Sequence, residues 1–75
     1  MITAQVILNN IESVNRFVAI MSEKPYDVDL GSGKYLVNAK SMMGVLSLDL
    51  TKPVTVNAET FDQAFLDEIK EYIVE

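Results

Sequence analysis

The side chains that most often carry out chemistry in proteins are missing from this sequence of 75 residues. It contains no histidine, which excludes the usual general base, the commonest metal ligand and phosphohistidine chemistry. It also contains no cysteine, which excludes a disulfide framework and a thiolate nucleophile. The sequence therefore predicts neither an enzyme nor a cofactor or metal site, and a reducing, cytoplasmic location fits it.

The remaining polar candidates have simpler explanations. Asp27 and Asp29 alternate along an extended segment, so they share one face and could suggest an acid pair or part of a cation site. No third ligand accompanies them, and a solvated strand face explains them better. Gly31 and Gly33 fit a turn, because the frame of a phosphate-binding loop, G-x-x-x-x-G-K-[ST], is absent.

Charge and length exclude several classes of protein. The net charge is −5, and the one arginine and five lysines are spread along the chain, so no basic stripe could bind nucleic acid or anionic lipid. No apolar run approaches the roughly 18 residues of a membrane span, and the first residues do not resemble a signal peptide. A chain this short forms one core, so we expect a single soluble domain over residues 1–75.

Hydrophobic periodicity predicts the first half of the fold. Residues 2–8 alternate as a strand does. Asn9 or Asn10 can then cap a helix that ends before Pro25, and Glu12 stands three after Asn9 as in a capping box. The apolar stripe of this helix is Ile11, Val14, Phe17, Val18 and Met21. Residues 26–30 and 34–38 predict a hairpin around the glycine-rich residues 31–33.

The second half predicts a fourth strand and a last helix. Val54, Val56 and Ala58 alternate after Pro53. Thr60 and Gln63 then form a T-x-x-Q capping box. It precedes the apolar stripe Phe61, Phe65, Ile69, Tyr72 and Ile73 and the outward-facing acids Asp62, Asp67, Glu68, Glu71 and Glu75. The order β-α-β-β-(39–50)-β-α favours an antiparallel sheet with helices on one face.

The stretch AKSMMGVLSLDL at residues 39–50 fits either a strand or a helix by spacing alone. Ser41 is a good N-cap, and we predict a helix of about two turns from Ser41 to near Leu48. So short a helix can bury only one stripe, and adjacent residues point about 100° apart, so Met42 and Met43 cannot both lie deep in the core. Some of the six apolar side chains of this stretch are therefore expected to face water, and core positions are expected at Val45, Leu48 and Leu50.

The string VNAKSMMGVLSLDL at residues 37–50 resembles the segment around the regulatory serine of HPr, the small phosphocarrier of the bacterial sugar phosphotransferase system. In that family a K-S-I-M-G-V-type run opens a short second helix. The length, the order of elements and the GSGK hairpin also agree. The resemblance implies an α+β fold, the HPr-like open-faced β-sandwich (β-α-β-β-α-β-α), with four antiparallel strands and three helices on one face.

The carrier site of the family is missing from this chain. The family carries its phosphoryl group on a histidine at the start of the first helix, in an H-A-R-P motif. Here the corresponding stretch is N-N-I-E-S-V-N-R-F-V (residues 9–18), without histidine and without proline after Arg16. Ser13 lies near the helix start, but phosphoserine is far more stable to transfer, and Glu12 would repel an incoming phosphoryl group.

The regulatory segment is retained. Ser41 matches the serine that an ATP-dependent HPr kinase phosphorylates in some family members, and Lys40 matches the preceding lysine. The simpler alternative is that Ser41 is only an N-cap. The resemblance also implies that Lys40, Met42, Met43 and Leu46 form a surface for docking partner proteins, for which methionine is well suited. A role for the methionines as gap-filling core residues is the alternative.

Two functions therefore remain. The first is a non-catalytic regulatory domain that binds proteins of the phosphotransferase system, with phosphorylation of Ser41 as a possible switch. The second is a phosphocarrier that uses a residue other than histidine. The oligomeric state and the identity of the partner are not predicted.

Overall fold

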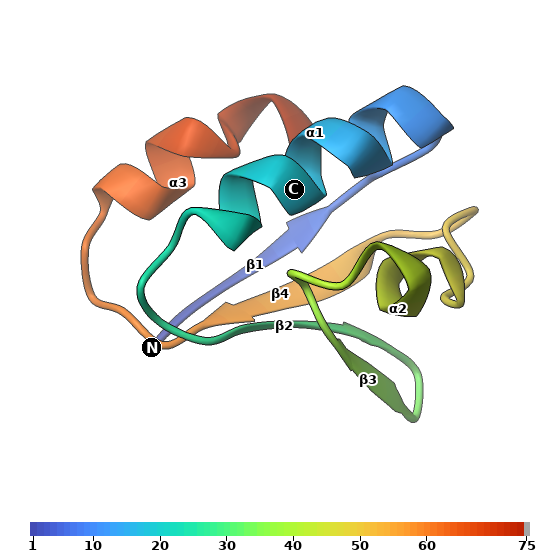
Figure 1. The fold of residues 1–75 in the computed structure, drawn as a ribbon, viewed down its shortest axis with the longest axis horizontal. Coiled ribbons are helices and arrows are strands. Elements are labelled where there is room, and N and C mark those ends of the chain that lie inside the picture. Colours follow the sequence, from blue (N-terminus) through green and yellow to red (C-terminus); the bar gives the residue numbers. More distant parts are fainter. Residues whose placement is uncertain (75) are drawn as a thin grey trace.

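The computed structural model describes residues 1–74, which form a four-stranded antiparallel sheet, three α-helices and one short 3-10 helix (Figure 1). The strands are β1 (Ile2–Val6), β2 (Val28–Ser32), β3 (Tyr35–Asn38) and β4 (Val54–Ala58). The helices are α1 (Ile11–Ser22), α2 (Met42–Leu46), α3 (Ala64–Glu68) and the 3-10 helix η1 (Lys70–Tyr72). The strand order is β1-β4-β2-β3, which confirms the predicted open-faced sandwich.

The core lies between the sheet and the helices. Leu30 of β2 faces Val56 of β4 in the strand register, and both side chains are fully buried. The ring of Phe17 from α1 meets that of Tyr72 edge-on, with centroids 5.8 Å apart. These contacts hold α1 and η1 over the same face of the sheet, since edge-to-face packing is a favoured arrangement of aromatic rings.

The outward-pointing side chains of β1 and β4 are polar and bond to one another across the strands. Thr3 Oγ1 donates to Asn57 Oδ1 at 3.1 Å, and Gln5 Nε2 donates to Thr55 Oγ1 at 2.8 Å. Alternation of buried and polar positions along a strand is what leaves one face of an antiparallel sheet in water.

The segment after η1 lies along the outer edge of β1. Ile7 N donates to Tyr72 O at 2.8 Å, Val74 N donates to Gln5 O at 2.9 Å, and Val6 forms an antiparallel bridge with Ile73. These bonds occupy backbone groups that an edge strand would otherwise expose.

The start of α1 differs from the prediction in two details. Asn10 is the N-cap, and its Oδ1 accepts from Ser13 N at 2.8 Å, so the capping box between Asn9 and Glu12 is wrong. Glu12 instead pairs with Arg16 at 2.9 Å. Ile11 was predicted to face the core but is exposed, because helical side chains lean toward the N-terminus and this one projects past the first turn.

The hairpin turn is shorter than predicted. Gly31 and Ser32 belong to β2, and Gly31 pairs with Leu36 of β3. Gly33 has a φ of 59°, while no other described residue has a positive φ. A positive φ at the first of two turn residues, Gly33 and Lys34, is typical of a type II′ turn, which needs glycine there.

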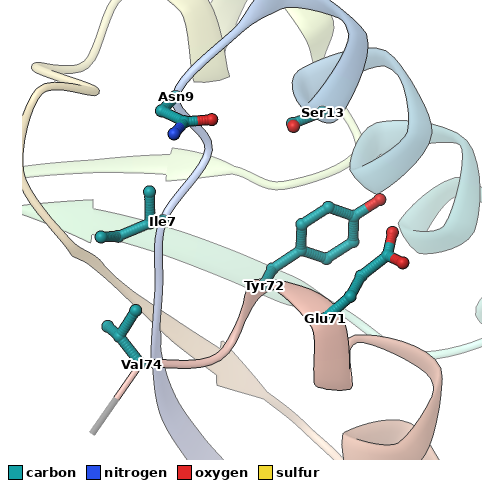
Figure 2. A pocket seen from close by; sticks show the side chains of 6 residues that line it. All are labelled: Ile7, Asn9, Ser13, Glu71, Tyr72 and Val74. Carbon is teal, nitrogen blue, oxygen red and sulfur yellow. The ribbon is translucent and has the colours of Figure 1, made fainter.

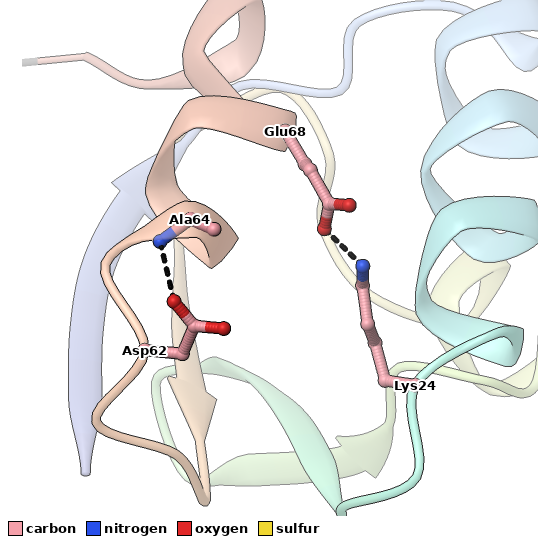
Figure 3. A network of polar contacts seen from close by, with 4 residues as sticks. All are labelled: Lys24, Asp62, Ala64 and Glu68. Carbon is pink, nitrogen blue, oxygen red and sulfur yellow. Dashed lines mark hydrogen bonds and ion pairs between the residues drawn. The ribbon is translucent and has the colours of Figure 1, made fainter.

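The last helix also begins later than predicted, at Ala64. Thr60 Oγ1 accepts from Asp62 N, and Asp62 Oδ1 accepts from Ala64 N at 3.0 Å (Figure 3), so local side-chain bonds hold residues 60–63 in a loop and the T-x-x-Q box is wrong. Phe61 is consequently outside the helix, with 85% of its surface exposed. Ile73 was predicted to be helical, but here the chain leaves η1 to pair with β1.

Candidate docking and modification site

Ser41 lies at the surface between β3 and α2 and caps that helix. Its Oγ accepts from Gly44 N at 3.2 Å, and its carbonyl accepts from Val45 N at 3.0 Å. Its backbone is extended, with φ −102° and ψ 112°, as N-cap residues are. The side chain is exposed, so a modifying enzyme could reach the hydroxyl, and the predicted cap is confirmed.

Gly44 allows α2 to pack closely against β3. A Cβ placed on Gly44 would lie 3.3 Å from Val37 Cβ and 3.3 Å from Ser41 Oγ. Both distances are tighter than ordinary carbon contacts, which prefer about 3.5–4.0 Å. The glycine therefore has a packing reason in spite of its low helix propensity.

Lys40 is held by the fold. Its N–H donates to Asn38 Oδ1 at 2.9 Å, and its Nζ donates to the carbonyl of Lys24 at 2.8 Å. That carbonyl lies just past the end of α1, where the helix presents partial negative charge. Lys24 in turn pairs through Nζ with Glu68 of α3 (Figure 3). A chain of polar contacts thus links Lys40, the residue before Ser41, to the end of α1 and to α3.

The apolar side chains of α2 divide between core and surface. Val45 is fully buried and Leu48 nearly so, while Leu50 is half-buried. Met43 and Leu46 leave 85% and 44% of their surfaces in water. Met42 is half-buried and packs against the core, so it is less exposed than predicted. We call Met43, Leu46 and Ser41 the α2 surface.

The start of α1, where the family's carrier residue would be expected, holds an asparagine cap and a half-buried Ser13. The nearby Glu12 and Arg16 neutralise each other in an exposed ion pair. No hydroxyl among these residues has a basic partner that would activate it as a nucleophile.

One feature of the surface was not predicted. A pocket of about 380 Å³ lies between the start of α1 and the last described residues, lined by Ile7, Asn9, Ser13, Glu71, Tyr72 and Val74 (Figure 2). Its residues come from opposite ends of the sequence, so no local pattern could have indicated it.

Two kinds of feature are missing from residues 1–74. No cluster of three acidic side chains in that range is arranged to hold a metal ion. No helix within it is both long enough and apolar enough to cross a membrane.

The comparisons with known proteins agree with the fold. A family model described as the PTS HPr component phosphorylation site matches residues 12–75. The crystal structure of HPr-C-His from Thermoanaerobacter tengcongensis is similar, with a TM-score of 0.78 and 22% sequence identity, over 95% of this chain and 89% of that one. The search of curated proteins gave no match.

Proposed function

The chain belongs to the HPr family of the sugar phosphotransferase system (PTS), and from this membership we propose that it is a non-catalytic regulatory domain that binds other proteins in the cytoplasm. The observation that carries the proposal is the α2 surface, where Met43 is 85% exposed on a helix capped by an exposed serine. Met43 and the exposed Leu46 stand three residues apart on α2 and so lie on one face of it, and neighbouring exposed apolar side chains mark a contact surface. The family's histidine is absent, so its own carrier chemistry is not available.

Phosphorylation of Ser41 is the proposed switch. A phosphate carries a charge of about −1.5 to −2 at neutral pH, and the free N–H groups at the start of α2 would favour it. Ser41 caps the same short helix that carries Met43 and Leu46, so the new charge would lie at the end of the surface that a partner covers. Desolvation of that charge would oppose binding of an apolar partner surface. The ammonium group of Lys40 already donates to the carbonyl of Lys24, so it would have to move to neutralise the phosphate.

Substitution of the α2 surface tests the docking function. In Met43→Asp and Leu46→Asp, binding of PTS proteins measured by pull-down and titration calorimetry should fall at least tenfold. Leu36→Asp is the matched control, because Leu36 is 63% exposed on β3 and lies outside the α2 surface. The docking function is wrong if the two α2 variants stay folded and bind every partner as the unchanged protein does.

Intact-protein mass measurement tests the switch separately. The protein is incubated with HPr kinase and ATP, and in a second mixture with enzyme I and phosphoenolpyruvate. We expect an acid-stable phosphate on Ser41 in the first mixture, abolished in Ser41→Ala, and none in the second. An acid-labile phosphate from the second mixture would contradict the proposal and identify a carrier that uses another residue.

A further inference from the structure

The two edges of the sheet differ in how they are covered. The edge strands are β1 and β3, and the chain after η1 bonds along the outer edge of β1 to the backbone of Gln5 and Ile7. Within residues 1–74 no strand pairs with the outer side of β3, which lies at the free end of the sheet in Figure 1. An open edge of this kind is a template on which another strand can pair.

The hydrogen bonds of the hairpin show which backbone groups of β3 are free. In an antiparallel pair, successive residues of a strand direct their N–H and C=O groups alternately toward and away from the partner strand. Ala39 N donates to Val28 O at 2.8 Å, so Ala39 faces β2. By alternation Val37 and Tyr35 also face β2, and the N–H and C=O of Leu36 point away from the sheet.

Leu36 is the residue of β3 at which both outward groups are available. Asn38 also faces outward, but its carbonyl already accepts from Ser41 N at 3.0 Å. One residue with a free N–H and a free C=O is enough for a closely spaced pair of hydrogen bonds with a residue opposite it.

The side chains of β3 leave apolar surface on both faces of this edge. Leu30 of β2 is buried under the helices, so its neighbour Gly31 and the paired Leu36 face the open side of the sheet, where Leu36 is 63% exposed. Tyr35 and Val37 face the side of the helices. Tyr35 is 75% exposed there, while Val37 is half-buried against the core. The strand contains neither a charged residue nor a proline, two common means of blocking an edge.

These features are complementary to themselves. When β3 of a second copy lies antiparallel with Leu36 opposite Leu36, each Leu36 N–H donates to the C=O of the other, and the two side chains meet on the open face. The same register places Tyr35 of each copy opposite Val37 of the other, and pairs of an aromatic and a β-branched residue across strands are favourable. We propose that this chain forms a symmetric dimer through β3, in which the two four-stranded sheets join into one continuous sheet.

The dimer is expected to be weak, because β3 has four residues and the contact is short. We expect a dissociation constant of about 0.1 to 1 mM. Each chain carries a net charge of −5, so repulsion between copies opposes the contact. Salt at about 0.5 M screens that repulsion and is the condition for the measurement.

Sedimentation velocity and amide hydrogen exchange test the proposal on the full chain, from about 10 µM to about 1 mM. The sedimentation coefficient should rise with concentration from that of a monomer toward that of a dimer. Exchange of the Leu36 N–H should slow in proportion to the fraction of dimer. The Val37 N–H is the internal control, because it already faces β2 and its exchange should not follow the dimer fraction.

Two variants test the contact itself. Leu36→Pro removes an N–H that the sheet does not use and should weaken the dimer at least tenfold, since each dimer loses two backbone hydrogen bonds. Tyr35→Asp leaves the backbone unchanged and should weaken the dimer about tenfold through the two lost cross-strand pairs. Phe61→Asp is the matched control, because it adds the same charge at another exposed aromatic residue, outside the sheet.

Three results would overturn the proposal. The first is a chain that stays monomeric at about 1 mM, including the case in which an added peptide of alternating valine and threonine protects the Leu36 N–H instead. The second is a dimer that keeps its affinity in a folded Leu36→Pro or in Tyr35→Asp. The third is equal weakening by Tyr35→Asp and Phe61→Asp, which would reflect added charge and not the β3 contact.

Discussion

Ser41 combines two roles in one side chain, because its hydroxyl already caps α2 and is also the group that the proposed switch would modify. Ser41→Ala should lower the free energy of unfolding by about 1 kcal/mol, the usual cost of losing an N-cap. Ser41→Asp should stay close to the unchanged protein, because aspartate caps equally well. Urea denaturation measures both, and an unaffected Ser41→Ala would show that the cap contributes no stability.

The hydroxyl of Tyr72 is expected to cost stability, because its oxygen is buried and meets no hydrogen-bond partner of ordinary geometry within residues 1–74. Tyr72→Phe should raise the free energy of unfolding at pH 7 by about 1 kcal/mol, because an unpaired buried polar atom is removed. The pKa of Tyr72 is raised in the folded protein, so the unfolded chain loses this proton first as the pH rises above about 10. The stability of the unchanged protein should therefore fall in that range.

Urea denaturation at pH 7 and at strongly alkaline pH compares the two proteins. The stability advantage of Tyr72→Phe should grow with pH, since phenylalanine does not titrate. A constant advantage would contradict the raised pKa, and lower stability of Tyr72→Phe at pH 7 would show that the hydroxyl has a stabilising partner.

At the scale of elements, the close contact between α2 and β3 depends on position 44 being a glycine, which has no side chain. Gly44→Ala gains about 1 kcal/mol of helix propensity, but its methyl group meets Val37 Cβ and Ser41 Oγ at 3.3 Å. Overpacking costs about 1–3 kcal/mol, so we expect a net loss of about 1 kcal/mol. Thermal unfolding of Gly44→Ala, Val37→Ala and the double variant measures it. Without a favourable coupling in that cycle, the close contact would not explain the glycine.

The elements that could be predicted from the sequence are those in which one face meets the core along its whole length. The alternation in β1 and β4 and the stripe Val14, Phe17 and Met21 of α1 are of this kind. The prediction that Phe61 is helical was wrong. Its spacing fits a helix, but the side-chain hydrogen bonds of Thr60 and Asp62 hold it in a loop. The Ser41 cap was local and could be predicted, whereas the pocket depends on residues far apart in the chain.

For the whole molecule, Phe17 and Phe61 allow a buried and an exposed phenylalanine to be compared for their contribution to stability. A domain of this length has roughly 4 to 11 kcal/mol of stability, from about 0.05 to 0.15 kcal/mol per residue. Phe17→Ala should remove about 3–5 kcal/mol of it, because Phe17 is fully buried against Tyr72. Phe61→Ala should change it by less than about 0.5 kcal/mol, as exposed substitutions do. Calorimetric melting compares the two, and a large effect of Phe61→Ala would show an unrecognised contact.

The pairing of β1 has a consequence for how the protein matures on the ribosome. Ile2 pairs with Ala58, and Gln5 and Ile7 bond to Val74 and Tyr72, so β1 has no partner until much later parts of the chain have emerged. At about 5–20 residues per second, its apolar side chains wait for several seconds of synthesis. The sheet can therefore close only after residues 54–58 have emerged, and residues 72–74 are added to the outer edge of β1 later still.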